Sequence, residues 1–551
     1  MKRSLKQCTN TRYDLVVIGG GIHGAAIACH AAEAGFSTLL LEKQDFSGAT
    51  SANSLKILHG GLRYLQHLNI RRMRQSICSR REMMRMAPHL VKPLACLMPA
   101  YGYGIRGKEI MRLALLLNDA IGWDRNKGVD GDISLAGGRI LDRENCIAAV
   151  PGIEGENLRG GVVWHDALSL NTERMVLEYL LAAADAGCEA ANYAEVTQLE
   201  MGADFRSEVI VHDRLSDERC CIRTSCIVNA AGPWLDNVIK GEGIKQQTTA
   251  HYAMALNIVV NRPLFRDYAV ALEGSVAYDD REALIRRGKR LYFFVPWRDS
   301  TMIGTNYRIC DQPPDSFSVS REDIHTMVDE VNRIYSSARL NYGDVTFYHA
   351  GLLPISGHGK GDDGNIQLEK HSRIIDHDQN GFPGLLSVRS VKYTTAPALA
   401  REVIECLEKK ITPSISPRSV LAAGEKMTGE GEVQESSCRE YLQEKYGRRA
   451  AVVSGYLQNS GGCEAWISLD PPLLKAEVEY CMEEEMALTL ADIVLRRTDL
   501  GTEKCPPDHV LNELASLMAK KLGWDSRRKQ REIDLLVSRY SLLEYYDGEE
   551  A

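Results

Sequence analysis

The chain has 551 residues, of which 44% are hydrophobic and 25% are charged. This composition is typical of a globular protein with roughly two to four domains, and it excludes a fibrous or largely disordered chain. A net charge of −8 and a pI near 6.0 give no reason to expect a nucleic-acid partner, although they say nothing about local basic patches.

Cysteine usage and the N-terminus predict the cellular compartment. The fifteen cysteines have no repeating spacing, and Cys220, Cys221 and Cys226 lack the paired spacing of a zinc site, so we expect no metal. Residues 1–12 are polar rather than an apolar signal core, and no window reaches the ~18 apolar residues of a spanning helix. We expect a cytoplasmic protein with reduced thiols.

Residues 13–42 have the order of elements of a dinucleotide-binding unit. A β-branched run over 13–18 leads into a glycine-rich turn of the pattern G-x-G-x-x-G and then into an alanine-rich helical stretch. A second apolar run ends at Glu42, which lies 23 residues after the first glycine of the turn. This full context favours dinucleotide binding over an ordinary glycine-rich turn.

Each residue of this pattern has a physical task. Gly19 permits the tight turn, and Gly21 lets the backbone approach a pyrophosphate at the positive end of the helix. Gly24 lets helix and sheet pack closely, and Glu42 can accept hydrogen bonds from a ribose diol.

The stretch 53–65, NSLKILHGGLRYL, interrupts an apolar rhythm with Lys56, His59 and Arg63. The pair Gly60-Gly61 would weaken either a helix or a strand there. We therefore expect the cations, the imidazole and the bare glycine backbone of this stretch to face a common site.

Basic residues are frequent over 63–92, and the segment 108–123 combines an apolar face with basic residues at its start. A basic amphipathic helix of this kind can lie in a membrane interface. An ordinary packing helix with a solvated face is the alternative.

The segment 226–234, CIVNAAGPW, predicts a strand that runs into a turn of small residues, Ala230, Ala231 and Gly232. Such a turn lets backbone pass close to a bound cofactor, although an ordinary strand-to-loop turn is the alternative. It is similar to the Ala-Thr-Gly-type motif of FAD-dependent oxidoreductases, with Ala231 in place of threonine, and it favours FAD over NAD.

The remaining patterns suggest the domain organisation. A helix is expected over 171–186, an antiparallel sheet over 245–345, and a helical, acidic pattern from residue 436 with a solvated run at Glu483, Glu484 and Glu485. We expect a discontinuous FAD-binding domain over 13–408, built from 13–85, 155–240 and 345–408. Its substrate-domain insertions would span about 86–154 and 245–345, followed by a linker at 409–435 and a helical domain at 436–530.

Several motifs in the same order resemble the FAD-dependent glycerol-3-phosphate dehydrogenase family. They are the run from Thr50 to Leu65, NAAGPW (229–234), VPW (295–297), IGT (303–305), KYTT (392–395) and the helical segment 477–501. The resemblance covers about residues 13–530. It implies an α/β fold: a Rossmann-like FAD-binding domain, an inserted antiparallel-sheet substrate domain and a C-terminal helical domain.

The resemblance also assigns site residues. It implies that the loop crosses the flavin, and it places Val196 against adenine and Gly351-Leu352 in a turn over the flavin. Lys392 is the best catalytic candidate, because an ammonium there would stabilise developing negative charge, although it could merely anchor the cofactor loop. His59 and His349 are weaker candidates for the base, and Arg389 is a further catalytic candidate. The further cofactor contacts expected from the resemblance are Ser51, Ser54, Lys56, His59, Gly60, Gly61, Lys392 and Thr394.

Alternatives exist for the cations of the loop. Arg63 and Tyr64 would either support it or face substrate, and Lys56 and Arg63 could instead make surface ion pairs.

The sequence departs from the family at the substrate site. Leu353 stands where the family usually has an arginine, and the loss of a charged phosphate contact costs roughly 1.5–3 kcal/mol. Arg389, Lys370, Arg373 and His349 could compensate, or the substrate could carry different groups.

We expect a flavoenzyme that oxidises a secondary alcohol of glycerol 3-phosphate or a related anionic polyol and passes electrons to a quinone. A D-amino-acid-oxidase-like amine or hydroxy-acid oxidase and a non-catalytic flavoprotein are the alternatives. FAD would be held noncovalently. Peripheral contact with the inner face of the plasma membrane and a homodimer are left open.

Overall fold

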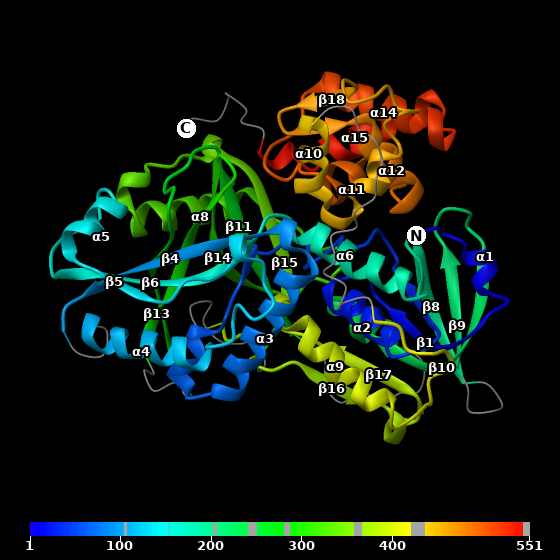
Figure 1. Cartoon of the computed structure of the whole chain (residues 1–551), viewed down its shortest axis with the longest axis horizontal. Helices are drawn as coiled ribbons and strands as arrows, with labels where there is room; N and C mark the ends of the chain where they lie inside the picture. Colours follow the sequence, from blue (N-terminus) through cyan, green and yellow to red (C-terminus); the bar gives the residue numbers. More distant parts are fainter. Residues whose placement is uncertain are drawn as a thin grey trace.

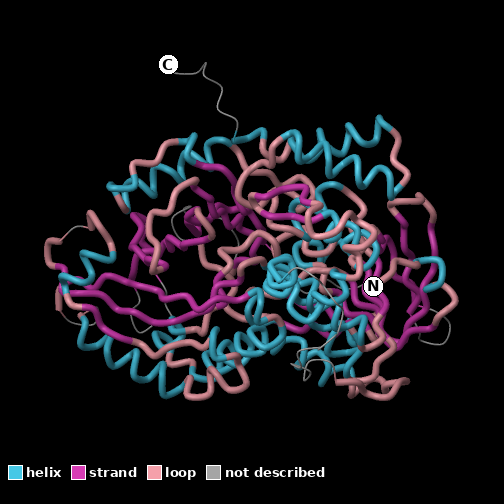
Figure 2. Tube along the Cα trace, turned by 45° about the horizontal axis from the view of Figure 1, so that its top comes forward, coloured by secondary structure: helices cyan, strands magenta, loops and turns pink. Residues whose placement is uncertain are grey.

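The structure, a computed structural model, describes residues 1–103, 107–153, 155–201, 207–240, 251–279, 287–356, 366–419 and 436–543. Two groups of strands lie side by side with helices around them, and the C-terminal residues form a separate helical group (Figures 1 and 2). Within the described residues, no helix is both long and apolar enough to cross a membrane.

The first sheet contains the dinucleotide-binding unit. Its central strand, β1 (Arg12–Ile18), pairs in parallel with β2 on one side and β10 on the other. The order along the sheet is β16-β17-β10-β1-β2-β7, and β9 joins β10 to β8. The other strands are β2 (Thr38–Leu41), β7 (Glu189–Ala191), β8 (Ala194–Met201), β9 (Ser207–Asp213), β10 (Arg219–Asn229), β16 (Arg373–Asp376) and β17 (Leu385–Arg389).

Three helices with largely buried side chains belong to this domain: α2 (Ile22–Glu33), α6 (Thr172–Asp185) and α9 (Ala396–Leu407). α2 packs against both of the others. α6 is the helix expected over 171–186, and it begins where the side chain of Asn171 accepts a hydrogen bond from the backbone N–H of Arg174. Residues of β1, α2 and α6 share one continuous apolar core.

The second sheet is antiparallel except for the β4–β12 pair, and its order is β15-β11-β14-β13-β12-β4-β6-β3, with β5 on β6. The strands are β3 (Ile57–Leu58), β4 (Val91–Tyr101), β5 (Arg139–Leu141), β6 (Leu158–Ser169), β11 (His251–Val260), β12 (Ala269–Asp279), β13 (Arg287–Trp297), β14 (Ser300–Cys310) and β15 (Val345–Ile355). The sequence placed 155–240 and 345–408 wholly in the FAD domain. The structure instead places β6 and β15 in this sheet, because β6 pairs with β4 and β15 with β11 over nearly their full lengths.

The C-terminal residues form a helical domain with its own apolar core and a two-stranded sheet, β18 (Trp466–Leu469) and β19 (Pro472–Leu474). It contains a short π-helical segment, η11 (Ile493–Arg497). Its helices are α10 (Ser436–Tyr446), α11 (Ala450–Ser454), α12 (Lys475–Glu484), α13 (Leu490–Asp492), α14 (Asp508–Leu522) and α15 (Ser526–Val537). The fold class predicted from the sequence is therefore confirmed.

Two expectations about the C-terminal part need comment. Of the predicted linker 409–435, residues 420–435 lie outside the described residues, whereas the backbone N–H of Ile415 donates to the carbonyl of Gly35. The predicted solvated run at 483–485 is wrong for Glu485, which is fully buried and whose carboxylate pairs with Arg174 of α6.

The remaining helices are α1 (Leu5–Cys8), α3 (Ile70–Met86), α4 (Lys108–Ile121), α5 (Arg143–Ala149), α7 (Leu235–Val238) and α8 (Arg321–Ile334).

Candidate functional site

The glycine-rich turn connects β1 to α2 and lies against the end of β10. Gly19 has a φ of +106°, and a Cβ added to it would lie 2.6 Å from the carbonyl oxygen of Ala230. A Cβ on Gly24 would lie 1.8 Å from the carbonyl oxygen of Gly19, so helix and turn pack too closely for any side chain. Gly21 is the N-cap of α2, which leaves the positive end of this helix facing the turn.

Two polar side chains fix the backbone around the turn. Glu42, directly after β2, accepts hydrogen bonds from the N–H of Gly20 (2.6 Å) and of Gln44 (2.8 Å). Ser51 Oγ accepts from the N–H of Ile22 at 3.0 Å. Burial raises the pKa of Glu42, although these two N–H groups partly lower it again.

A cavity of about 400 Å³ runs past this turn. It extends from the end of β1 to the segment Arg389–Tyr393, which links β17 to α9. The predicted site residues that line it are Gly19, Gly21, Glu42, Ser51, Val196, Ala230, Ala231, Gly232, Leu352, Arg389 and Lys392.

A smaller cavity of about 150 Å³ shares Lys392 and Tyr393 with the larger one. Its walls include residues 54–59 and residues 392–394, which precede α9. The predicted site residues that line it are Ser54, Lys56, His59, Lys392 and Thr394.

Lys392 therefore stands between the two cavities. Its ammonium lies 4.3 Å from the ring centre of Tyr64, and the guanidinium of Arg72 lies 4.5 Å from the same ring. Burial, followed by the charges of Arg72 and Arg63, lowers the pKa of Lys392 to about 7. An amine in this state can carry or release a proton near neutral pH.

His59 forms a pair with Asp166 of β6. His59 Nδ1 lies 3.1 Å from Asp166 Oδ2, and the imidazole keeps 41% of its surface exposed. The N–H of Gly60 and the guanidinium of Arg80 both donate to Asp166 Oδ1. Burial would raise the pKa of Asp166, but the hydrogen bond with His59 and the charge of Arg80 hold it well below its ordinary value. Asp166 is thus an ionised carboxylate that orients the imidazole.

Lys56 makes a buried ion pair, so the surface ion pair considered from the sequence is wrong. Its ammonium is buried and lies 2.8 and 2.9 Å from the two carboxylate oxygens of Glu173 on α6, with Thr172 Oγ1 at 3.1 Å. Lys56 also lines the smaller cavity, so a cofactor contact stays a prediction beside this ion pair.

Five predicted residues line neither cavity: Gly24, Gly60, Gly61, His349 and Gly351. His349 is buried against Phe347 and Trp297, with ring centres 5.0 and 5.9 Å away. Burial, then the charges of Lys56 and Arg298, lower its pKa well below the ordinary value. This position does not suit a base that must reach substrate.

Of the residues expected to compensate for the missing family arginine, some line the larger cavity and others do not. Leu353 itself lines the larger cavity, as does Arg389, which pairs with Glu369 at 3.5 Å. Lys370 is half-buried and Arg373 is exposed on β16, and neither lines either of the two cavities described above.

Sequence reasoning missed several residues. His23, inside the glycine-rich turn, lines the larger cavity, and its Nε2 has no hydrogen-bond partner among the described residues. Asp315, from the segment after β14, lies at the rim, where it pairs with Lys43 (2.6 Å) and accepts from Trp234 Nε1 (2.8 Å). A histidine within the G-x-G-x-x-G pattern was a visible signal, whereas nothing local marked Asp315.

The larger cavity fits an elongated dinucleotide. Its floor is a glycine cradle, since a Cβ on Gly21 would already lie 3.0 Å from Ser51 Oγ. The lining includes the Glu42 carboxylate, which suits a ribose diol, and His23, whose buried Nε2 has no hydrogen-bond partner among the described residues.

The family model for FAD dependent oxidoreductases matches residues 14–406, and the model for the C-terminal domain of alpha-glycerophosphate oxidase matches residues 424–529. The glycerol-3-phosphate dehydrogenase of Synechocystis sp. is 29% identical over 96% of this chain and 97% of its own length. The human mitochondrial glycerol-3-phosphate dehydrogenase is 27% identical over 95% of this chain and 72% of its own length.

Among solved structures, the glycerol-3-phosphate dehydrogenase from Bacillus halodurans complexed with FAD superimposes with a TM-score of 0.74. It covers 99% of both chains at 22% identity, so the two proteins share one fold from end to end. FAD is therefore the cofactor, and this chain belongs to the FAD-dependent glycerol-3-phosphate dehydrogenase family.

Proposed function

We propose that the protein oxidises the secondary alcohol of glycerol 3-phosphate, or of a related anionic polyol, and passes the electrons to a quinone. The observation that carries this proposal is the position of Lys392, between the cofactor cavity and a smaller cavity that also contains His59. A cation and an imidazole beside the reacting carbon are what oxidation of an anionic alcohol requires.

When bound, FAD supplies a two-electron acceptor for the hydride that leaves the substrate carbon. Its pyrophosphate would lie at the Gly19–Gly21 turn and the N-terminus of α2, its ribose at Glu42, and its adenine near Val196. The turn Ala230–Gly232 and the backbone at Leu352 would border the remaining part of FAD.

The protein residues would move the proton and stabilise charge. His59 takes the hydroxyl proton, and Asp166 holds the imidazole in place through Nδ1 and stabilises the imidazolium that forms. Lys392 would stabilise the negative charge that develops on the substrate oxygen as its proton leaves and on the flavin that accepts the hydride. Arg63 and Arg72, whose charges already act on Lys392, make this end of the site cationic and suited to a phosphate.

The test is anaerobic reduction of the bound flavin by a panel of substrates: glycerol 3-phosphate, other phosphorylated polyols, 2-hydroxy acids and amines. We expect the absorbance of oxidised flavin to disappear fastest with a phosphorylated polyol. Asp166→Asn should slow the reduction and shift its pH profile, because the imidazole loses its orienting carboxylate. Reduction by amines alone would contradict the proposal.

Leu353 argues for a substrate somewhat different from that of ordinary family members. We expect turnover of glycerol 3-phosphate to be weaker than that of the unidentified preferred polyol. Equal efficiency with glycerol 3-phosphate and every other polyol in the panel would contradict this part of the proposal.

The acceptor is tested by reoxidation. After reduction, we expect quinone analogues to restore the oxidised flavin faster than NAD⁺ or oxygen. The name of the C-terminal family model, which refers to an oxidase, makes oxygen the competing acceptor, and hydrogen peroxide formation measures it directly.

We further propose that α4 contacts a membrane surface. α4 lies at the outer edge of the molecule beside the second sheet (Figure 1). Leu113 and Leu116 on this helix are 55% and 61% exposed and Trp123 just beyond it is 78% exposed, whereas Leu115 is buried. Exposed apolar side chains next to the basic residues of α3 and α4 suit an anionic bilayer.

Flotation with anionic liposomes tests this contact. Replacing Leu113, Leu116 and Leu117 together by Glu should abolish flotation without lowering the thermal midpoint. The control Leu115→Glu should lower the midpoint, because Leu115 packs inward. Equal flotation of the triple variant and the wild type would remove α4 from the proposal.

A further inference from the structure

Asp45 lies in the loop that joins two sides of the cofactor cavity. Glu42 stands before it, and Gly48 to Ser51 stand after it, and all of these residues line the cavity. The backbone N–H of Ser47 donates to the carbonyl of Gly20 at 3.0 Å, so this loop also contacts the glycine-rich turn. The position of Asp45 therefore affects both cofactor contacts.

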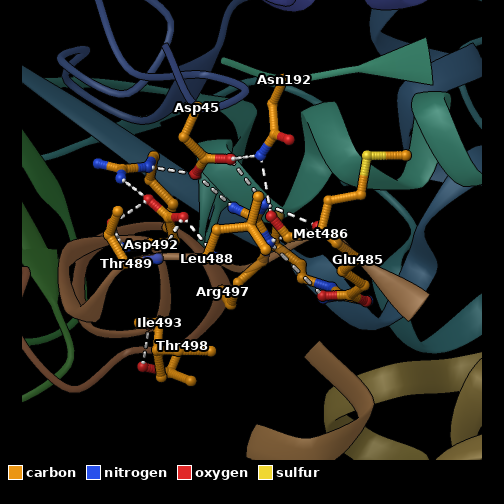
Figure 3. A network of polar contacts seen from close by, with 12 residues as sticks. Asp45, Asn192, Glu485, Met486, Leu488, Thr489, Asp492, Ile493, Arg497 and Thr498 are labelled. Carbon is orange, nitrogen blue, oxygen red and sulfur yellow. Dashed lines mark hydrogen bonds and ion pairs between the residues drawn. The ribbon is translucent and has the colours of Figure 1, made fainter. Parts of the chain in front are cut away.

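The carboxylate of Asp45 points toward Arg497 of the C-terminal domain (Figure 3). Arg497 binds it with both ends of its guanidinium, Nη1 to Oδ2 and Nη2 to Oδ1, each at 2.7 Å. Arg496 Nε also donates to Oδ2. The paired, two-point geometry fixes the direction of the carboxylate as well as its charge.

Both arginines belong to the π-helical segment η11, in which the N–H of Thr498 donates to the carbonyl of Ile493 at 3.0 Å. Short π-helical segments of this kind are frequent at functional sites. Here the segment presents two consecutive arginines to the carboxylate of Asp45.

Further hydrogen bonds hold the two arginines in position. Arg496 Nη2 donates to Asp492, and Asp492 also accepts from the hydroxyl of Tyr193, at 2.7 Å, in the FAD domain. Arg497 Nη2 donates to the backbone carbonyl of Glu485 at 2.8 Å.

Asn192, directly after β7, completes the connection between the domains. Its Nδ2 donates to Asp45 Oδ1 at 3.0 Å and to the carbonyl of Met486 at 2.9 Å. We name Asp45, Asn192, Asp492, Arg496 and Arg497 the Asp45 network.

The side chains of the Asp45 network are buried, so each charged group needs its oppositely charged partners to offset the loss of hydration. Burial would raise the pKa of Asp45, but the charges of Arg497 and Arg496 hold it at about 2. A buried charge without its partner is strongly unfavourable, so moving the Asp45 loop away from the two arginines has a large free-energy cost.

We infer that the C-terminal helical domain positions the cofactor loop 42–51 through Asp45, so that docking of this domain and retention of FAD are coupled. Because coupling between two binding events is reciprocal, bound FAD should stabilise the docked C-terminal domain as much as the docked domain favours FAD. This inference requires only FAD binding and is independent of the substrate.

The test measures FAD affinity and thermal stability on the full chain. Apoprotein is titrated with FAD, whose fluorescence reports binding, and the thermal midpoint is recorded with and without FAD. Asp45→Asn should raise the dissociation constant of FAD at least tenfold. It should also reduce the increase in thermal midpoint that FAD gives to the wild type.

Glu477→Gln is the matched control. Glu477 is also a fully buried carboxylate, paired with Lys445 at 2.7 Å and with the hydroxyl of Tyr446 at 2.9 Å, but these partners all lie within the C-terminal domain. This variant should lower the thermal midpoint of apoprotein and holoprotein equally and leave the dissociation constant within twofold of wild type.

Two results would overturn the inference: an unchanged FAD dissociation constant in Asp45→Asn, or an equal increase in Asp45→Asn and Glu477→Gln. If Asp45→Asn gives no soluble protein, Arg496→Gln decides the question, because it removes one guanidinium from Asp45 and Asp492 and leaves the Arg497–Asp45 pair in place. It should raise the dissociation constant severalfold, and affinity equal to wild type would overturn the inference.

Discussion

Replacing Lys392 by methionine should stabilise the apoprotein at neutral pH, and the same substitution should slow flavin reduction in the holoprotein. In the folded apoprotein, burial and then the charges of Arg72 and Arg63 lower the pKa of Lys392 from 10.5 to about 7. In the unfolded chain the same lysine has its ordinary pKa. Between these two values the unfolded chain binds a proton that the folded chain has released, so the stability of the wild type rises with pH there.

The size of the effect follows from the pKa difference. One pKa unit corresponds to ~1.4 kcal/mol, so the two units between neutral pH and about pH 9 change the stability of the wild type by roughly 3 kcal/mol. Below the folded pKa the full cost of the buried ammonium is present. Methionine fills a similar volume without charge, so Lys392→Met should be more stable than wild type at neutral pH. That advantage should shrink by roughly 3 kcal/mol by about pH 9.

Denaturant unfolding of the apoprotein at both pH values measures this difference, and stopped-flow flavin reduction measures the functional cost. Lys92→Met is the control, because Lys92 is exposed on β4 and its replacement makes the same change of charge. A stability difference between wild type and Lys392→Met that does not vary with pH would refute the reasoning. Unchanged flavin reduction would remove Lys392 from the proposed mechanism.

Three further predictions address the cofactor cavity, the buried ion pair and the substrate. Gly21→Val should expel FAD, seen as loss of flavin absorbance, because even a Cβ there approaches Ser51 Oγ to 3.0 Å; a fully yellow variant would contradict the assignment. Lys56→Met should cost ~3–5 kcal/mol of unfolding free energy, because Glu173 stays buried without its partner, and the double variant with Glu173→Leu should recover most of it. Loss of FAD from Lys56→Met without any loss of stability would instead make Lys56 a cofactor contact. Leu353→Arg should lower the KM for glycerol 3-phosphate roughly tenfold or more, since one charged hydrogen bond contributes ~1.5–3 kcal/mol, and an unchanged KM would show that this side chain does not reach the substrate.

The sequence by itself determined the elements whose signals are local. The β-branched run before Gly19 and the alanine-rich run after it predict a strand, a turn and a helix, because strand burial and helix packing leave short-range patterns. The helix at 171–186 and the amphipathic helix at 108–123 were predictable for the same reason. The ordered set of motifs then indicated the family, and through it FAD.

The tertiary structure alone decided which charges meet. Lys56 and Glu173 are 117 positions apart, and Asp45 and Arg497 are 452 positions apart, so no periodicity connects them. The same holds for Glu485, which looked like part of a solvated acidic run until Arg174 of another domain was found beside it. A side chain's charge is visible in the sequence, but its partner depends on how distant strands and helices pack, and that packing determines whether the charge is solvated, structural or part of the site.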